Sequence, residues 1–225
     1  MKNIFIFRHG QSEANANVKG LLSPKKEYVT DSSFGLTSEG KKQAYETGKK
    51  LAKKIKGEEY VIYISPYERT RQTAKSMQVA LVNGGVLFKK RIEDPRLVEQ
   101  DFGDFDFQYR DKWPEISPHS YKVNQARYND PLGRFFARLE NGENLLDVYN
   151  RVSLFVTTRL ERELAISDAK NHIIVTHGNT MRILKMFMLD MRVENFATMS
   201  LPTNASGFHI GFDESTNSYL DLGKI

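Results

Sequence analysis

The sequence predicts an α/β fold, with a mainly parallel central sheet and helices on both faces of that sheet. Short apolar runs typical of buried strands alternate along the 225 residues with longer segments of helical periodicity. This alternation favours βαβ units, in which a helix connects two parallel strands. A chain of this length can bury one sizeable core, so we expect a single domain over residues 1–225.

The strands are predicted from apolar runs of strand length. Ile4–Phe7, Tyr60–Ile64 and His172–Thr176 are nearly continuous apolar or β-branched segments, as expected for strands that are buried on both faces. Phe208–Phe212 instead alternates large apolar residues with His209 and Gly211. That alternation predicts a final strand with one exposed face.

The helices are predicted from apolar residues that recur every three to four positions. The first begins after Thr37, a residue type that favours the N-cap. The second begins near Arg69 and ends at Asn83-Gly84-Gly85. The third runs from about Asn144 to Leu164, and the last begins beside His177.

Two irregular segments interrupt this pattern. Residues 16–35 form a long connection before the first predicted helix. Between about 104 and 142 the periodicity is broken by Pro114, Pro118 and Pro131, and aromatic residues accumulate. We interpret residues 104–142 as a small irregular or helical cap inserted above the strand ends, and we expect both segments to border a site.

The composition excludes several classes of protein. The absence of cysteine rules out disulfides, thiol nucleophiles and sulfur-based zinc sites. No apolar run is long enough for a signal sequence or a membrane span, so a cytoplasmic protein without a membrane partner is expected. The net charge of +5 is modest. The sequence contains no basic stripe with interleaved aromatic residues, so a nucleic-acid partner is not expected.

Two histidine-glycine pairs follow predicted strands. Arg8-His9-Gly10 comes directly after Ile4–Phe7, and His177-Gly178 comes directly after His172–Thr176. Ligand sites of open α/β sheets form beyond the carboxyl ends of parallel strands. The two histidines are therefore expected to meet at one edge of the sheet.

Four motifs in this order resemble those of the histidine phosphatase superfamily, which includes cofactor-dependent phosphoglycerate mutases and many acid and small-molecule phosphatases. The resemblance extends from Lys2 to about Phe212. The motifs are Arg8-His9-Gly10-Gln11-Ser12-Glu13-Ala14-Asn15, Ser65-Pro66-Tyr67-Glu68-Arg69-Thr70-Arg71-Gln72-Thr73-Ala74, Arg96-Leu97-Val98-Glu99 and Thr176-His177-Gly178-Asn179-Thr180.

Phosphoryl transfer needs a positioned nucleophile, cations and donors on the phosphoryl oxygens, and a proton for the leaving oxygen. His9 is the expected nucleophile, because Arg8 and Arg69 would lower its pKa and keep the ring unprotonated. The two guanidinium groups also suit bidentate contacts with phosphate. His177 is expected to donate to the transferring group, and the Gly178 amide at the start of the last helix would add to the same anion site.

Three further residues complete the candidate site. Asn15 offers a neutral donor, although it could simply cap a turn, and Ser12 either contacts phosphate or supports the loop. The resemblance implies that Glu99 protonates the leaving group and later accepts a proton from the water that attacks the phosphohistidine. Other carboxylates compete for this assignment: Glu93, Asp94, Asp101, Asp104 and Asp106.

The segment after Glu99 bears on the choice between hydrolysis and isomerisation. Mutases of the superfamily carry a motif resembling Glu-Arg-x-Tyr-Gly-x-Leu-x-Gly-x-Asn-Lys. Here Glu99-Gln100-Asp101-Phe102-Gly103-Asp104-Phe105-Asp106-Phe107 keeps the glutamate and glycine but lacks the arginine, the tyrosine and the final Asn-Lys. This segment, with Asn141–Asn144 and Asp147–Val152, is more similar to the broad-range microbial phosphatases.

The resemblance therefore implies a metal-independent phosphomonoesterase, with no cofactor, that forms a phosphohistidine at His9. Its partner would be a small anionic phosphomonoester, such as a sugar phosphate, a glycolytic phosphate or a nucleoside monophosphate. The alternatives are mutase-type phosphoryl transfer, a catalytically weak protein that binds phosphorylated ligands, and a basic RNA-associated protein. The sequence leaves the substrate and homo-oligomerisation open.

Overall fold

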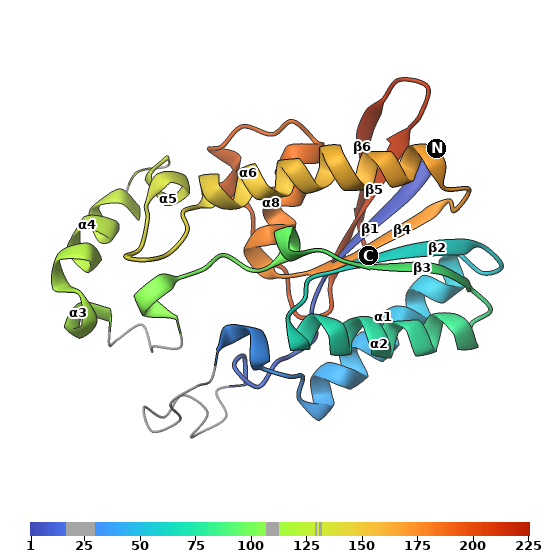
Figure 1. Ribbon diagram of the computed structural model, residues 1–225, viewed down its shortest axis with the longest axis horizontal. Coiled ribbons are helices and arrows are strands. Elements are labelled where there is room, and N and C mark those ends of the chain that lie inside the picture. Colours follow the sequence, from blue (N-terminus) through green and yellow to red (C-terminus); the bar gives the residue numbers. More distant parts are fainter. Residues whose placement is uncertain (17–29, 107–112, 129, 131) are drawn as a thin grey trace.

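The computed structural model describes residues 1–16, 30–106, 113–128, 130 and 132–225 (Figure 1). Within them, six strands form one sheet in the order β3-β2-β4-β1-β5-β6. The first four strands are mutually parallel, whereas β5 is antiparallel to β1 and β6 is antiparallel to β5. The predicted mainly parallel α/β sheet is thus confirmed. The strands are β1 (Lys2–Arg8), β2 (Glu59–Ile64), β3 (Leu87–Glu93), β4 (Asn171–Thr176), β5 (Gly207–Asp213) and β6 (Ser218–Lys224).

Helices cover both faces of the sheet (Figure 1). On one face α1 (Ser38–Lys54) and α2 (Glu68–Asn83) pack on Phe5 and Phe7 of β1. On the other, α6 (Leu145–Phe155) and α8 (Gly178–Met188) pack on Ile4 and Ile6. Alternate side chains of one strand therefore enter two separate cores. In the part of the chain that the structure describes, the helices are too short or too polar to cross a membrane.

The predicted helix ends are confirmed where their caps can be seen. The Thr37 hydroxyl accepts a hydrogen bond from the Gly40 amide at 3.0 Å. Asn144 and Asp147 form a reciprocal capping box at the start of α6. The predicted helix from Asn144 to Leu164 continues from α6 through the π-helical η5 (Val156–Leu160) into α7 (Glu161–Ile166).

The edge strands differ from the sequence prediction. Strand β3 was not predicted, because most of its side chains are exposed at the edge of the sheet and Lys89, Lys90 and Arg91 interrupt any apolar run. Strand β6, at the other edge, is also largely exposed and was not predicted. The prediction of one exposed face for Phe208–Phe212 was wrong. This segment of β5 lies between β1 and β6, and its residues are buried, with His209 stacked on Phe5 at 4.5 Å between ring centroids.

The predicted cap is partly helical. It contains α3 (Trp113–Ile116), α4 (Pro118–Tyr128) and α5 (Gly133–Phe136), which lie to one side of the sheet in Figure 1. Pro118 occupies the first position of α4, where the missing amide costs no helical hydrogen bond. Residues 107–112, 129 and 131 of the predicted cap, and 17–29 of the predicted 16–35 connection, lie outside the described residues. A 3-10 turn, η1 (Asp31–Ser33), and the short helix α9 (Asn195–Thr198) complete the elements that matter below.

The loop after β1 packs against the first turn of α1 through two glycines. A Cβ atom on Gly10 would lie 2.3 Å from the Gly40 carbonyl oxygen, and one on Gly40 would lie 2.1 Å from the Gln11 carbonyl oxygen. Neither backbone atom can move as a flexible side chain could. Close backbone contact therefore fixes the loop that follows His9.

We expect Gly40→Ala to destabilise the fold by about 1–3 kcal/mol, the usual cost of overpacking. Alanine favours a helix by about 1 kcal/mol over glycine, but the contact with Gln11 outweighs this gain. Urea denaturation would measure the change, with Lys41→Ala, at the exposed next position, as the control. A Gly40→Ala protein as stable as the parent would contradict the proposed backbone contact.

Candidate active site

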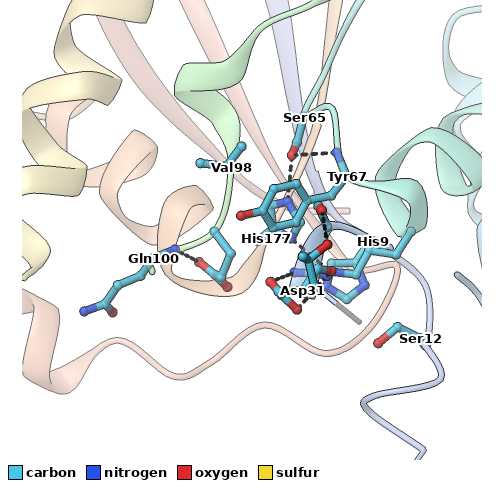
Figure 2. A network of polar contacts seen from close by, with 12 residues as sticks. His9, Ser12, Asp31, Ser65, Tyr67, Val98, Gln100 and His177 are labelled. Carbon is cyan, nitrogen blue, oxygen red and sulfur yellow. Dashed lines mark hydrogen bonds and ion pairs between the residues drawn. The ribbon is translucent and has the colours of Figure 1, made fainter. Parts of the chain in front are cut away.

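The two histidines lie at the carboxyl ends of two neighbouring parallel strands, β1 and β4. In the β1–β4 pair, Arg8 lies opposite Thr176, so His9 and His177 follow at adjacent strand ends. Their ring centroids are 5.2 Å apart, and both side chains are buried. The structure thus brings together the two histidine-glycine pairs that were expected to meet. Figure 2 shows the polar network around His9, Asp31, Ser65 and His177.

The orientation of the His9 ring leaves one nitrogen available for chemistry. Nδ1 lies 2.7 Å from the Gly10 carbonyl oxygen, which can only accept, so Nδ1 carries the proton and Nε2 carries the lone pair. Burial, and then the charge of Arg69 with a smaller effect of Arg8, hold the pKa of His9 well below its usual value. The ring is therefore neutral at neutral pH, and Nε2 can act as a nucleophile.

His177 is held on both sides. Its Nε2 lies 2.8 Å from the Ser65 hydroxyl, and its Nδ1 accepts from Arg69 Nε at 3.3 Å. Burial, and then Arg69 and His9, hold the pKa of His177 well below its usual value. In this arrangement the neutral ring carries its proton on Nε2. To donate to a phosphoryl group through Nδ1, the ring must adopt the other tautomer, with the Ser65 hydroxyl donating to Nε2, and a hydroxyl can do either.

Arg69 lies at the start of α2 and is engaged by Asp31. Its Nη1 donates to the Asp31 carbonyl oxygen at 2.6 Å and to Oδ1 at 2.9 Å, and its Nη2 donates to Oδ2 at 2.7 Å. Asp31 belongs to η1 and was not singled out in the sequence, since it belongs to none of the motifs. The guanidinium group expected to bind phosphate therefore holds an internal carboxylate.

Arg8 is less engaged than Arg69. Its Nη1 donates to the Pro202 carbonyl oxygen at 2.7 Å. Its Nε is buried and has no hydrogen-bond partner among the described residues. Buried donors are nearly always paired in native proteins, so a donor of this kind suits an anionic ligand.

Glu99 lies at the start of α8. Its carboxylate accepts from the amides of Asn179 and Thr180, each at 3.3 Å. It thus occupies the positive end of the helix dipole. Gly178 begins α8 as expected, and a Cβ atom there would lie 3.7 Å from both Arg8 Nε and Glu99 Oε2. Glu99 and Arg8 therefore both lie beside the first residue of α8.

The competing carboxylates are occupied elsewhere, with one exception. Glu93 pairs with Arg71 and Arg91, and Asp94 pairs with Arg96. Asp101 and Asp104 bond to Gly103 and Asn141, respectively. Asp106 differs, because burial and then the charges of Asp31 and Asp101 raise its pKa to about 8. Of these carboxylates and Glu99, only Glu99 lines the cavity described below.

Asn15 and Ser12 form a small turn in the first loop. Ser12 Oγ accepts from the Asn15 amide at 3.1 Å, so Ser12 supports the loop. Asn15 Oδ1 accepts from the Ser12 amide at 3.3 Å and from Asn204 Nδ2 at 3.0 Å. These bonds fix Oδ1 as an acceptor, so Nδ2 is the end of the Asn15 amide that can donate to a ligand.

A cavity of about 650 Å³ opens beside Glu99 and extends to the cap. Trp113 of α3 and Gln125 of α4 contribute to its wall, so the cap borders the site as expected. The lining combines aromatic rings, aliphatic groups and amides with two arginines. It consists of Arg8, Asn15, Glu99, Gln100, Phe102, Trp113, Gln125, Leu145, Asn179, Arg182, Phe196 and Leu201.

Arg151 of α6 holds the segment that carries Glu99. Its Nη1 donates to the carbonyl oxygens of Arg96 and Val98, and its Nη2 donates to that of Glu99 at 3.0 Å. Glu143 pairs with Arg151 Nε at 2.9 Å. This arginine carried no functional signal in the sequence, because the carbonyl groups that it holds lie more than fifty residues away in the chain.

We expect Arg151→Gln to lower kcat by about 10- to 100-fold, because small displacements of a catalytic group cost rates of this order. Binding of inorganic phosphate should change little, since Arg8 and Arg69 remain in place. Steady-state kinetics with phosphate inhibition would separate the two effects. Arg162→Gln, an exposed arginine of α7, is the control, and a loss of phosphate affinity without loss of kcat would contradict this role.

Comparisons with known proteins agree with this geometry. A family model for the histidine phosphatase superfamily, branch 1, matches residues 4–224. The phosphoglycerate mutase-like protein AT74H of Arabidopsis thaliana is 33% identical, over 99% of this chain and 82% of that protein. The broad-range acid phosphatase DET1 of Saccharomyces cerevisiae is 24% identical, over 96% of this chain and 87% of that protein. Several bacterial 2,3-bisphosphoglycerate-dependent phosphoglycerate mutases match at 25 to 28% identity.

Among solved structures, the alpha-ribazole phosphatase of Shigella flexneri matches with a TM-score of 0.72. The match covers 98% of this chain and 95% of that one, at 20% sequence identity. At this identity the likeness establishes a shared fold and carries no conclusion about substrate.

Proposed function

The chain belongs to the histidine phosphatase superfamily, and on this basis we propose that it hydrolyses small phosphorylated metabolites through a phosphohistidine at His9. The observation that carries the proposal is the His9 ring, whose Nδ1 is tied to the Gly10 carbonyl and whose Nε2 is the free nucleophile. The neighbouring Arg8 and Arg69 would supply donors for phosphoryl oxygens, as would His177 in its other tautomer, and Glu99 supplies a carboxyl at the start of α8.

The proposed reaction has two steps. In the first, His9 Nε2 attacks phosphorus, the bond from phosphorus to the ester oxygen breaks, and Glu99 gives its proton to the departing alkoxide. In the second, the Glu99 carboxylate takes a proton from a water molecule that attacks the phosphohistidine. The phosphorus–nitrogen bond breaks, inorganic phosphate leaves, and both His9 and Glu99 return to their starting states.

The proposed mechanism uses guanidinium groups where other phosphatases use metal ions. Arg8, Arg69 and the donor face of His177 would offset the charge that develops on the phosphoryl oxygens. We therefore propose that no metal is required, and that EDTA leaves turnover unchanged. Loss of activity in EDTA with recovery on adding a divalent cation would contradict this part of the proposal.

Hydrolysis is favoured over mutase activity by the lining of the cavity beside Glu99. A phosphoglycerate must place a carboxylate there, but Gln100, Gln125 and Asn179 contribute neutral amides. Arg182 lines the cavity too, yet its Nη2 donates to the carbonyl oxygens of Phe196 and Met199. A substrate with an uncharged leaving alcohol fits these groups better than one with a carboxylate.

The test is a panel of phosphomonoesters, including 3-phosphoglycerate with and without 2,3-bisphosphoglycerate, assayed for both phosphate release and isomerisation. We expect phosphate release without isomerisation. Isomerisation without net phosphate release would instead establish the mutase. Tight phosphate binding with no turnover of any ester would favour the alternative of a protein that only binds phosphorylated ligands.

A further inference from the structure

We propose that Asp31 determines the anion selectivity of the site, because its carboxylate occupies the guanidinium fork of Arg69 and competes there with the phosphoryl group of the substrate. The inference rests on the proposed function, in which Arg69 binds phosphate. Two separate Nη–Oδ bonds, at 2.9 and 2.7 Å, give this contact the bidentate geometry that a phosphate would otherwise adopt.

The donors of Arg69 are nearly all in use. One bond goes from Nε to His177 Nδ1, and three go to Asp31, including its carbonyl oxygen. A guanidinium group has five N–H donors, so these four bonds leave about one for a ligand. A phosphoryl group can bind the fork of Arg69 only if the Asp31 side chain moves away.

Arg8 presents the opposite situation. Its buried Nε has no hydrogen-bond partner within the described part of the chain. An entering anion can therefore bind Arg8 at once but must displace Asp31 to reach Arg69. A phosphoryl dianion carries twice the charge of a carboxylate, so it can displace Asp31 where a simple carboxylate cannot. Asp31 would thus exclude ordinary carboxylate metabolites and weaken inhibition by the phosphate product.

The surroundings of Asp31 allow this exchange. Asp31 lies in the short turn η1, and its side chain is 25% exposed, whereas that of Arg69 is 5% exposed. The carboxylate can therefore turn toward solvent while the arginine stays fixed. Asp101 and Asp106 lie near enough for their charges to interact with Asp31 or its neighbours, whereas the hydrogen bonds of Arg69 among the described residues go to Asp31 and His177.

The experiment measures the binding of inorganic phosphate by calorimetry in the parent, Asp31→Asn, Asp31→Ala and Asp101→Asn proteins. Asp31→Asn keeps the shape of the side chain, and Asp101→Asn removes a nearby charge without contacting Arg69. We expect both Asp31 variants to bind phosphate on the order of tenfold more tightly, the change that corresponds to about one charge-assisted hydrogen bond. Asp101→Asn should change the affinity by less than about threefold, as expected for a partly screened charge.

A second measurement uses acetate as a probe of the fork. Acetate should inhibit hydrolysis of p-nitrophenyl phosphate competitively in Asp31→Ala, because it can take the place of the missing carboxylate, and should inhibit the parent far less. Thermal unfolding of each variant shows whether it is folded. Asp31→Asn provides the phosphate-binding result if Asp31→Ala is not folded.

The outcomes separate the inference from the proposed function. If the parent turns over phosphomonoesters but the Asp31 variants bind phosphate equally or less tightly, Asp31 positions Arg69 and the inference is overturned. An equal gain in Asp101→Asn would overturn it too, since general electrostatics would then explain the effect. If the parent neither binds phosphate nor hydrolyses any ester, the proposed function fails, and the inference fails with it.

Discussion

Replacing His9 with alanine is expected to lower kcat by at least about ten-thousandfold on every phosphomonoester that the protein hydrolyses. The substitution removes Nε2, the only atom of the site proposed to bond to phosphorus. The remaining groups, Arg8, Arg69 and His177, keep their positions and should still bind phosphate. A large fall in kcat with retained phosphate binding is therefore the expected signature, measured by steady-state kinetics and calorimetry.

His119→Ala is the matched control, because His119 is an exposed histidine of the cap helix α4. Its removal should leave kcat within about twofold of the parent, as for most surface substitutions. If His9→Ala retained more than a few per cent of the parent kcat, a residue other than His9 would have to be the nucleophile.

Replacing Glu99 with glutamine is expected to lower kcat by about 100- to 10,000-fold for alkyl phosphates, the range typical of a lost general acid. The loss in kcat/KM, which reports the first step, should be smaller for p-nitrophenyl phosphate, whose leaving oxygen needs no proton there. Phosphohistidine should then accumulate in the variant, because the attack of water still needs the Glu99 carboxylate. Comparing kcat/KM for the two leaving groups measures the effect.

The pH dependence follows from the same assignment. The pKa of His9 is lowered, so its ring stays neutral from neutral pH well into the acid range and does not limit the rate there. The proposed first step uses the proton of Glu99, so activity should fall as the pH rises. Glu99→Gln should abolish this dependence for alkyl phosphates. A parent profile that rises steadily to pH 9 would contradict the assignment of the acid.

Asp106→Asn is the appropriate companion variant. The raised pKa of Asp106, about 8, makes it a carboxyl near the site that holds a proton at neutral pH. Asp106 does not line the cavity beside Glu99, so we expect its replacement to preserve the leaving-group dependence of the parent. If Asp106→Asn reproduced the effects expected of Glu99→Gln, Asp106 would be the acid.

The sequence was informative where burial imposed a pattern. Strands β1, β2 and β4 lie inside the sheet and had to be apolar, and their order placed His9 and His177 at one edge. Strands β3 and β6 were missed because their side chains are largely exposed at the edges of the sheet. An exposed edge strand needs no apolar run. The error for β5 arose because His209 and Gly211, which suggested an exposed face, are buried, His209 against Phe5.

Contacts between distant parts of the chain set the second limit. Ser65 and Arg151 both lie in segments that the motifs highlighted, but Ser65 meets His177 across 112 residues and Arg151 meets Glu99 across 52. Asp31 lies in a segment without any motif, so its contact with Arg69 had no signal in the sequence. Motifs in the sequence identify the candidate reacting groups. The residues that orient these groups, or compete with the substrate for them, can be identified only from the structure.

The central claim is that a covalent bond forms transiently between His9 and phosphorus. Its most direct test is intact-mass measurement after rapid mixing with substrate and an alkaline quench, followed by peptide mapping of any adduct. The account predicts a gain of one phosphoryl group on the peptide that contains His9, and none in His9→Ala. Turnover at the full rate with no such adduct in the parent, on a time scale shorter than one catalytic cycle, would contradict it.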